Sequence, residues 1–196
     1  ELVIFATRAG RGRMQIPCVN KDEKQFEVSV NCLMRDRDAN IWVGTWGAGI
    51  YLLDSRFNKI AGYTHSNAGN NSINSDFINC MTQDKEGDIW IGTDDGLNKL
   101  DKVTGKFIQY RHSTNEKKSI SHNEINQIHE DKKGQLWIAS AGGLDLFDKV
   151  KEKMISFTKE DGLPSSTIQS IEEDRRGTLW LSTGNGVTAF NTITKK

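Results

Sequence analysis

The sequence has few prolines and cysteines and no long apolar run. Its 196 residues contain two prolines and three cysteines, against 18 glycines. No run approaches the ~18 apolar residues of a membrane helix, and no basic start precedes an apolar secretory segment. We therefore expect no direct membrane insertion in this segment. Cys18, Cys32 and Cys80 lack the even number and short spacing typical of a disulfide framework or a zinc site, so no metal is expected.

An excess of charge of one sign is also absent. The chain has 26 Lys and Arg residues against 26 Asp and Glu residues. A balanced chain produces no global field that would attract nucleic acid or an anionic membrane surface. We expect no nucleic-acid partner, and a ligand must be recognised by local shape and chemistry.

Four tryptophans recur at a nearly constant interval. By subtraction of their numbers, Trp42, Trp90, Trp137 and Trp180 lie 48, 47 and 43 residues apart. Each lies in a similar stretch, for example QDKEGDIWIGTDDGLNKLD and EDKKGQLWIASAGGLDLFD. This interval is typical of a propeller blade, and the short apolar runs between Gly, Asn and Asp indicate strands joined by tight turns. We interpret all four tryptophans as core between blades.

The residues around each tryptophan predict a turn followed by a strand. An Asp lies six residues before each Trp, where its carboxylate can accept backbone N–H groups and close a turn. Gly87, Gly134 and Gly177 supply the left-handed position of that turn. Ala39 replaces the glycine in the first copy, so its turn should be strained or differently built.

The fold class predicted is all-β, a β-propeller fragment of four complete four-stranded blades plus a partial N-terminal blade. In the second unit we expect strands a to d over 77–83, 88–93, 97–101 and 106–112. The units are assigned to 1–26 (partial blade), 27–75, 76–123, 124–166 and 167–196, the last with an incomplete fourth strand.

Antiparallel order divides the turns between the two faces of the disc. The a–b and c–d turns lie on one face, and the b–c turns and d–a loops lie on the other. The b–c turns differ in chemistry from unit to unit, which favours ligand recognition there. The d–a loops are long and polar, but Ile73, Ile120 and Leu163 should anchor them in the core.

These motifs resemble the two-component regulator propeller repeats. The resemblance rests on the four Trp segments, on Ser72-Ile73-Asn74, Ser119-Ile120-Ser121 and Gly162-Leu163-Pro164, and on residues 105–110. It implies a periplasmic propeller that senses oligosaccharides within a hybrid two-component system of the kind found in gut Bacteroidetes. The parent protein would be an inner-membrane sensor histidine kinase, and this chain would carry no phosphotransfer chemistry.

Candidate ligand residues follow from the geometry of the b–c turns. Trp46 is the only tryptophan outside the repeat position, and its indole could stack on a sugar or pack under a neighbouring loop. Asp94 and Asp95 could accept hydrogen bonds from hydroxyls or hold Ca²⁺, but two adjacent carboxylates without further oxygen ligands are a poor metal signature, and a solvated turn is the favoured interpretation. Asn185 occupies the corresponding turn of the last unit.

Two arginines of the N-terminal partial blade complete the candidate set. Arg8 and Arg11 lie in an enlarged b–c turn, where guanidinium groups could bind a carboxylate or sulfate on an acidic sugar.

The sequence contains no clear set of catalytic residues. The four histidines, His65, His112, His122 and His129, lie in different units without a clustered acid–base partner. We interpret His65 and His112, which are repeat equivalents, as structural. The chain is therefore predicted to be no enzyme and to need no cofactor; a propeller lyase and a protein-interaction scaffold remain the alternatives.

A short run of blades leaves an apolar sheet face uncovered at each end. We expect these faces to be covered by the protein's own further blades or by a second copy, in a homodimer.

Overall fold

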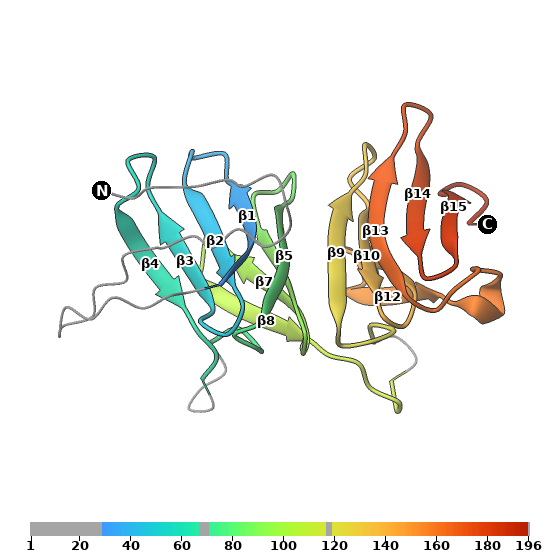
Figure 1. Cartoon of the computed structure of the whole chain (residues 1–196), viewed down its shortest axis with the longest axis horizontal. Coiled ribbons are helices and arrows are strands. Elements are labelled where there is room, and N and C mark those ends of the chain that lie inside the picture. Colours follow the sequence, from blue (N-terminus) through green and yellow to red (C-terminus); the bar gives the residue numbers. More distant parts are fainter. Residues whose placement is uncertain (1–28, 67–70, 117–118, 196) are drawn as a thin grey trace.

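The computed structural model describes residues 29–66, 71–116 and 119–195, which form four antiparallel sheets (Figure 1). The first sheet contains β1 (Val30–Arg35), β2 (Ile41–Thr45), β3 (Ile50–Leu53) and β4 (Lys59–Tyr63). The second contains β5 (Ile78–Gln83), β6 (Ile89–Thr93), β7 (Gly96–Asp101) and β8 (Lys106–Tyr110). The third contains β9 (Ile125–Glu130), β10 (Leu136–Ser140), β11 (Leu144–Asp148) and β12 (Lys153–Phe157). The fourth contains β13 (Ile168–Glu173), β14 (Thr178–Thr183) and β15 (Gly186–Asn191).

Each sheet is one propeller blade, with its strands paired in chain order. The first strands of the blades, β1, β5, β9 and β13, pack against one another in sequence and lie towards the middle of Figure 1. The all-β propeller fold is therefore confirmed. Three blades have four strands, and the last has three, in line with its expected incomplete fourth strand. The expected partial blade over 1–26 lies outside the described residues.

The turn between strands a and b is built around its aspartate. In the second blade, Asp84 Oδ1 accepts the backbone N–H of Asp88 at 2.9 Å, and Asp84 Oδ2 accepts the indole N–H of Trp90 at 2.7 Å. The same indole bond forms in the other three blades at 3.0, 3.0 and 3.2 Å. Ala39 has a φ of 65°, so it adopts the left-handed conformation that the glycines supply elsewhere, as expected for a strained turn.

The core lies between the blades. Trp42, Trp90 and Trp137 are fully buried, and each packs against the following blade. Trp90 meets Phe147 at 5.0 Å between ring centroids, and Trp137 meets Phe190 at 5.6 Å. Trp180 departs from this pattern, with 45% of its surface exposed. The prediction that all four tryptophans are core is wrong for Trp180, because no described sheet covers that face of the last blade.

The d–a loops are held by the expected apolar anchors and by two histidines. Ile73, Ile120 and Leu163 are buried. His65 Nδ1 lies 3.0 Å from the carbonyl oxygen of Ile73, and His112 Nδ1 lies 2.8 Å from that of Ile120. These imidazoles fix the loops that carry the anchors, so the structural interpretation of both histidines agrees with their contacts.

Two cysteine side chains pack directly against glycines of the neighbouring strand in the same blade, where a larger residue would clash. A Cβ on Gly44 would lie 2.5 Å from Cys32 Sγ, and one on Gly92 would lie 2.6 Å from Cys80 Sγ. Both thiols are free. Burial raises the pKa of Cys32 to about 12 and raises that of Cys80 as well, so both are unreactive packing groups.

A polar clamp joins neighbouring blades on the face of the a–b turns. The residue after the turn aspartate donates its backbone N–H to the side chain that ends the first strand of the next blade. The three bonds run from Arg37 to Gln83 (2.9 Å), from Lys85 to Glu130 (2.9 Å) and from Lys132 to Glu173 (3.1 Å).

The side chain of the same residue completes the clamp. It donates to carbonyl oxygens of the next a–b turn: Arg37 bonds those of Asp84 and Lys85 at 2.8 Å each, and Lys132 bonds that of Asp174 at 2.6 Å. A lysine of the next c–d turn adds an ion pair at two of the interfaces, from Lys102 to Asp38 and from Lys149 to Glu86.

Replacing a tryptophan by alanine should therefore reduce the free energy of unfolding more at a blade that is covered on both sides than at the last blade. Trp137→Ala leaves a cavity at a fully buried position and removes the hydrogen bond from the indole N–H to the Asp131 carboxylate. We therefore expect a loss of about 3–5 kcal/mol in the free energy of unfolding. Trp180→Ala should cost about 1 kcal/mol. Urea denaturation followed by circular dichroism measures both, and equal losses would contradict the assignment of Trp180 to an uncovered face.

Candidate functional site

A β-bulge recurs at the same position of every blade. The pairing of the first and second strands shifts register at Asn31, Asn79, Asn126 and Gln169. A bulge leaves the extra residue out of the ladder and turns its side chain in a new direction. In each blade this residue is an amide near the start of the strand, at the end where the d–a loops and b–c turns lie.

The bulged asparagines tie each blade to the next. The Nδ2 atoms of Asn31, Asn79 and Asn126 donate to the carbonyl oxygens of Ile78, Ile125 and Ile168, at 2.9, 2.9 and 2.8 Å. Each amide keeps its oxygen and a second N–H proton for another partner.

The amides surround a polar pocket of about 320 Å³. Its lining comes from all four blades: Asn31, Asn79, Asn126, Gln169, Glu124 and Thr167. Glu124 and Thr167 directly precede the first residues of β9 and β13. The pocket therefore lies where the blades meet, and its walls can both donate and accept hydrogen bonds.

An aromatic pair lies on the same face. Trp46, in the b–c turn of the first blade, is 53% exposed and meets Phe77 edge-on, with ring centroids 5.2 Å apart. Phe77 precedes the first residue of β5, so it occupies the position that Glu124 and Thr167 hold in the next two blades. The sequence left two interpretations of Trp46 open, stacking on a sugar or packing under a neighbouring loop. The structure shows an indole that is about half exposed and is contacted from one side by Phe77.

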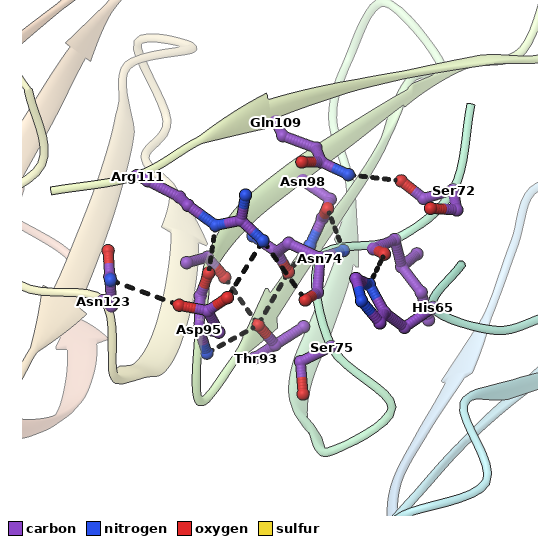
Figure 2. A network of polar contacts seen from close by, with 12 residues as sticks. His65, Ser72, Asn74, Ser75, Thr93, Asp95, Asn98, Gln109, Arg111 and Asn123 are labelled. Atoms are coloured by element: carbon purple, nitrogen blue, oxygen red, sulfur yellow. Dashed lines mark hydrogen bonds and ion pairs between the residues drawn. The ribbon is translucent and has the colours of Figure 1, made fainter. Parts of the chain in front are cut away.

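The two aspartates of the next b–c turn have different surroundings. Asp94 is exposed. Asp95 accepts a hydrogen bond from Arg111 Nη2 at 2.9 Å and another from Asn123 Nδ2 at 3.2 Å (Figure 2). Arg111, which the sequence analysis did not single out, thus neutralises Asp95 and joins the turn to the end of β8.

Beneath this turn lies a buried amide network (Figure 2). Asn74 Oδ1 accepts from Thr93 Oγ1 at 2.8 Å and from Asn98 Nδ2 at 2.6 Å, and the Asn74 backbone N–H donates to Asn98 Oδ1 at 2.9 Å. Asn74 Nδ2 is buried without a hydrogen-bond partner. The network fixes the d–a loop to the b–c turn, so the variable face rests on a rigid support.

The third blade builds the same support around a carboxyl group. Asp145 replaces Asn98, and it accepts from the backbone N–H and the hydroxyl of Ser121 and from the hydroxyl of Ser156. Burial raises the pKa of Asp145 above its ordinary value, although the serine hydrogen bonds oppose the rise.

The remaining predicted site residues lie apart. Asn185 Nδ2 donates to the carbonyl oxygen of Pro164 at 2.7 Å, so it braces its own d–a loop in the fourth blade. Arg8 and Arg11 lie outside the described residues. The structure therefore brings Trp46, Asp94 and Asp95 onto adjacent blades, and Asn185 is two blades further along.

The sequence profile of the two-component regulator propeller matches residues 72–95, 119–142 and 162–185. Each match runs from a loop anchor to the following b–c turn. The chain is built from two-component regulator propeller repeats. No curated protein matches the sequence.

Solved structures support the same assignment. The extracellular domain of the putative hybrid two-component system BT3049 from B. thetaiotaomicron is 31% identical, with a TM-score of 0.76. That match covers 93% of this chain and 24% of that one, so the chain spans about a quarter of its relative.

More distant structures show the fold alone. PorZ of Porphyromonas gingivalis, a surface component of the type-IX secretion system, is 17% identical with a TM-score of 0.52 and coverage of 94% and 34%. A Bacteroides caccae protein of unknown function is 12% identical with a TM-score of 0.59 and coverage of 96% and 69%.

The sequence analysis missed the amides of the pocket. The signal was present, because each propeller repeat begins its first strand with Val-Asn, Ile-Asn, Ile-Asn or Ile-Gln. A polar residue after the first apolar residue of a strand is ordinary alternation, and only the bulge turns it towards the pocket.

In the described parts of the chain, no group of three or more His, Cys, Asp or Glu side chains is placed to hold a metal ion. Those parts also contain no helix with the length and apolar character to span a membrane.

The raised pKa of Asp145 predicts a pH-dependent stability. The folded protein holds the proton of this carboxyl more tightly than the unfolded chain does. Its stabilising contribution is therefore complete below the ordinary pKa of Asp, about 3.9, and is lost as the pH rises through the raised pKa. Asp145→Asn, which installs the residue of the second repeat, should gain stability relative to the wild type as the pH rises.

Urea unfolding at a series of pH values measures this difference. Asp148→Asn is the matched control on the same strand, because hydrogen bonds from Lys151 lower the pKa of Asp148. That variant should lose stability relative to the wild type as the pH rises. Parallel curves for the two variants would contradict the assigned role of Asp145.

Proposed function

We propose that this chain is the ligand-sensing part of an extracytoplasmic two-component receptor, and that it binds its ligand on the face of the b–c turns, at the polar pocket. The observation that carries the proposal is the pocket itself, lined from all four blades. The similarity to the extracellular domain of a hybrid two-component system supports the receptor role and a periplasmic location.

An oligosaccharide fits this face best. Sugar hydroxyls both donate and accept hydrogen bonds, as do the amides of Asn31, Asn79 and Asn126. Sugar rings also present C–H faces that stack on exposed aromatic side chains, and Trp46 with Phe77 offers such a platform. Arg111 balances the charge of Asp95, and the carboxyl groups of Asp94 and Glu124 on the same face would repel an acidic sugar, which favours a neutral saccharide over an acidic one.

We further propose that the chain binds without turnover, so that signal output depends on occupancy. Three of the four histidines support this: His65 and His112 bond to loop carbonyls, and His122 Nδ1 accepts the backbone N–H of Glu124 at 3.0 Å. Phosphotransfer would belong to a kinase region elsewhere in the parent protein.

A protein-interaction surface on the opposite face is the second candidate. Val103 and Val150 occupy equivalent positions in the c–d turns of the second and third blades, and they are 94% and 93% exposed. Ile193 follows the last strand at the same position and is also exposed. Repeated apolar tips are a feature of protein contact surfaces.

Trp46→Ala separates the two candidates. If the indole stacks on a sugar, the variant should weaken oligosaccharide binding by about 1–3 kcal/mol while leaving the melting temperature nearly unchanged. Isothermal titration calorimetry with a panel of neutral and acidic oligosaccharides measures the affinity.

The matched control is Phe57→Ala, an exposed aromatic residue in the c–d turn of the same blade. It should leave saccharide binding unchanged. Equal affinity of the wild type and Trp46→Ala for a bound saccharide would remove the indole from the site, and loss of binding in Phe57→Ala would move the site to the opposite face.

A further inference from the structure

The polar pocket contains a carboxylate that is not balanced by a cation of the chain. Glu124 lines the pocket together with the amides of Asn79 and Asn126, and no Lys, Arg or His side chain of the described residues lines it. Within those parts of the chain the Glu124 side chain also forms no ion pair and accepts no hydrogen bond. An ionised carboxylate can only accept hydrogen bonds, so a ligand matches this wall of the pocket with a donor or a positive charge.

The amides add further acceptor atoms to the pocket. Asn31, Asn79 and Asn126 each donate an Nδ2–H to a carbonyl of the next blade, which fixes the nitrogen end of each amide. Their Oδ1 atoms accept no hydrogen bond from the described residues. Thr167 Oγ1 points its proton towards the carbonyl oxygen of Ala141, at 3.5 Å, so its lone pairs remain as acceptors. The pocket therefore presents acceptor oxygens together with one negative charge.

Other carboxylates of the same face have the same effect on a ligand. Asp94 is exposed. Asp76, in the d–a loop before β5, accepts the backbone N–H of His65 at 2.7 Å, and no cation among the described residues pairs with it. Only Asp95 is balanced, by Arg111. The unbalanced carboxylates attract a positively charged group and repel an acidic one.

A protonated amino group matches these surroundings better than a hydroxyl group does. An ammonium carries a positive charge and three N–H donors, so it can pair with the Glu124 carboxylate and also donate to amide oxygens such as those of Asn79 and Asn126. A hydroxyl has a single O–H donor and no charge, and its hydrogen bond to the same carboxylate is weaker.

We propose that the pocket selects a saccharide with a free amino group, and that Glu124 is the specificity-determining residue, which binds the ammonium. This inference rests on the proposed function, because it assigns the class of ligand to the same pocket. The repulsion of acidic sugars leaves neutral and basic saccharides as ligands, and Glu124 discriminates between these two classes.

Three trimers with the same β-1,4-linked backbone test the proposal. The glucosamine trimer has free amino groups, its fully N-acetylated form has neutral amides in their place, and cellotriose has hydroxyls at the same carbons. Isothermal titration calorimetry is run at a slightly acidic pH, where the amino groups are protonated. We expect the glucosamine trimer to bind with a Kd about ten-fold below that of either neutral trimer.

Two exposed carboxylates provide a variant and its matched control. Glu124→Gln keeps the size of the side chain and removes its charge. It should weaken binding of the glucosamine trimer about ten-fold and leave the affinity for the N-acetylated trimer unchanged. Asp94→Asn makes the same charge change on the same face but outside the pocket lining, so it should keep the wild-type preference for the amino form.

Two results would overturn this inference and leave the proposed function intact. The first is binding of the neutral trimers as tightly as the glucosamine trimer. The second is a preference for the amino form that Glu124→Gln lowers no more than Asp94→Asn does, because the general charge of the face would then select the ligand. Absence of binding by every neutral, acidic and amino-bearing saccharide would overturn the proposed function as well.

Discussion

The bond between the turn aspartate and the indole N–H supports the rest of the structure. In Asp36, Asp84 and Asp131 a nearly buried carboxylate closes the a–b turn with one oxygen and holds the tryptophan with the other. For Asp36, burial acts to raise the pKa, but hydrogen bonds from Trp42 and Asn40 outweigh it and lower the pKa. The carboxylate therefore stays ionised and fixes the indole between two blades.

The position of these bonds, at the a–b turns, explains why the two faces of the disc differ. The a–b turn face is committed to stability, because its aspartates fix the tryptophans and its clamps join the blades. On the b–c face the bonds between blades come from the bulged asparagines of the first strands and not from the b–c turns, so these turns can change from Trp46 to Asp94 and Asn185 without disturbing the core. A uniform frame thus presents a variable surface.

Local sequence patterns predicted the strands and turns of the blades, but they did not predict the polar pocket. The strands of the second unit were expected within two residues of β5 to β8, because turn aspartates, glycines and alternation act over a few residues. The pocket depends on four sheets meeting, and the Arg111–Asp95 pair joins residues 16 apart, so neither follows from a local pattern. Trp180 was misassigned because its burial depends on a neighbour, which its own repeat cannot specify.

The pocket and the blade interfaces share the same side chains. Asn31, Asn79 and Asn126 line the pocket, and each donates from the same amide to the next blade. A ligand bonded to these amides would restrict their rotation and hold the inter-blade bonds in place, so binding and blade arrangement are thermodynamically linked. Because the pocket is lined from all four blades, one bound molecule would act on every interface between them. Through such coupling, binding of a ligand in the pocket would stiffen the contacts between all four blades, which is a physical means by which a sensor propeller could respond to its ligand.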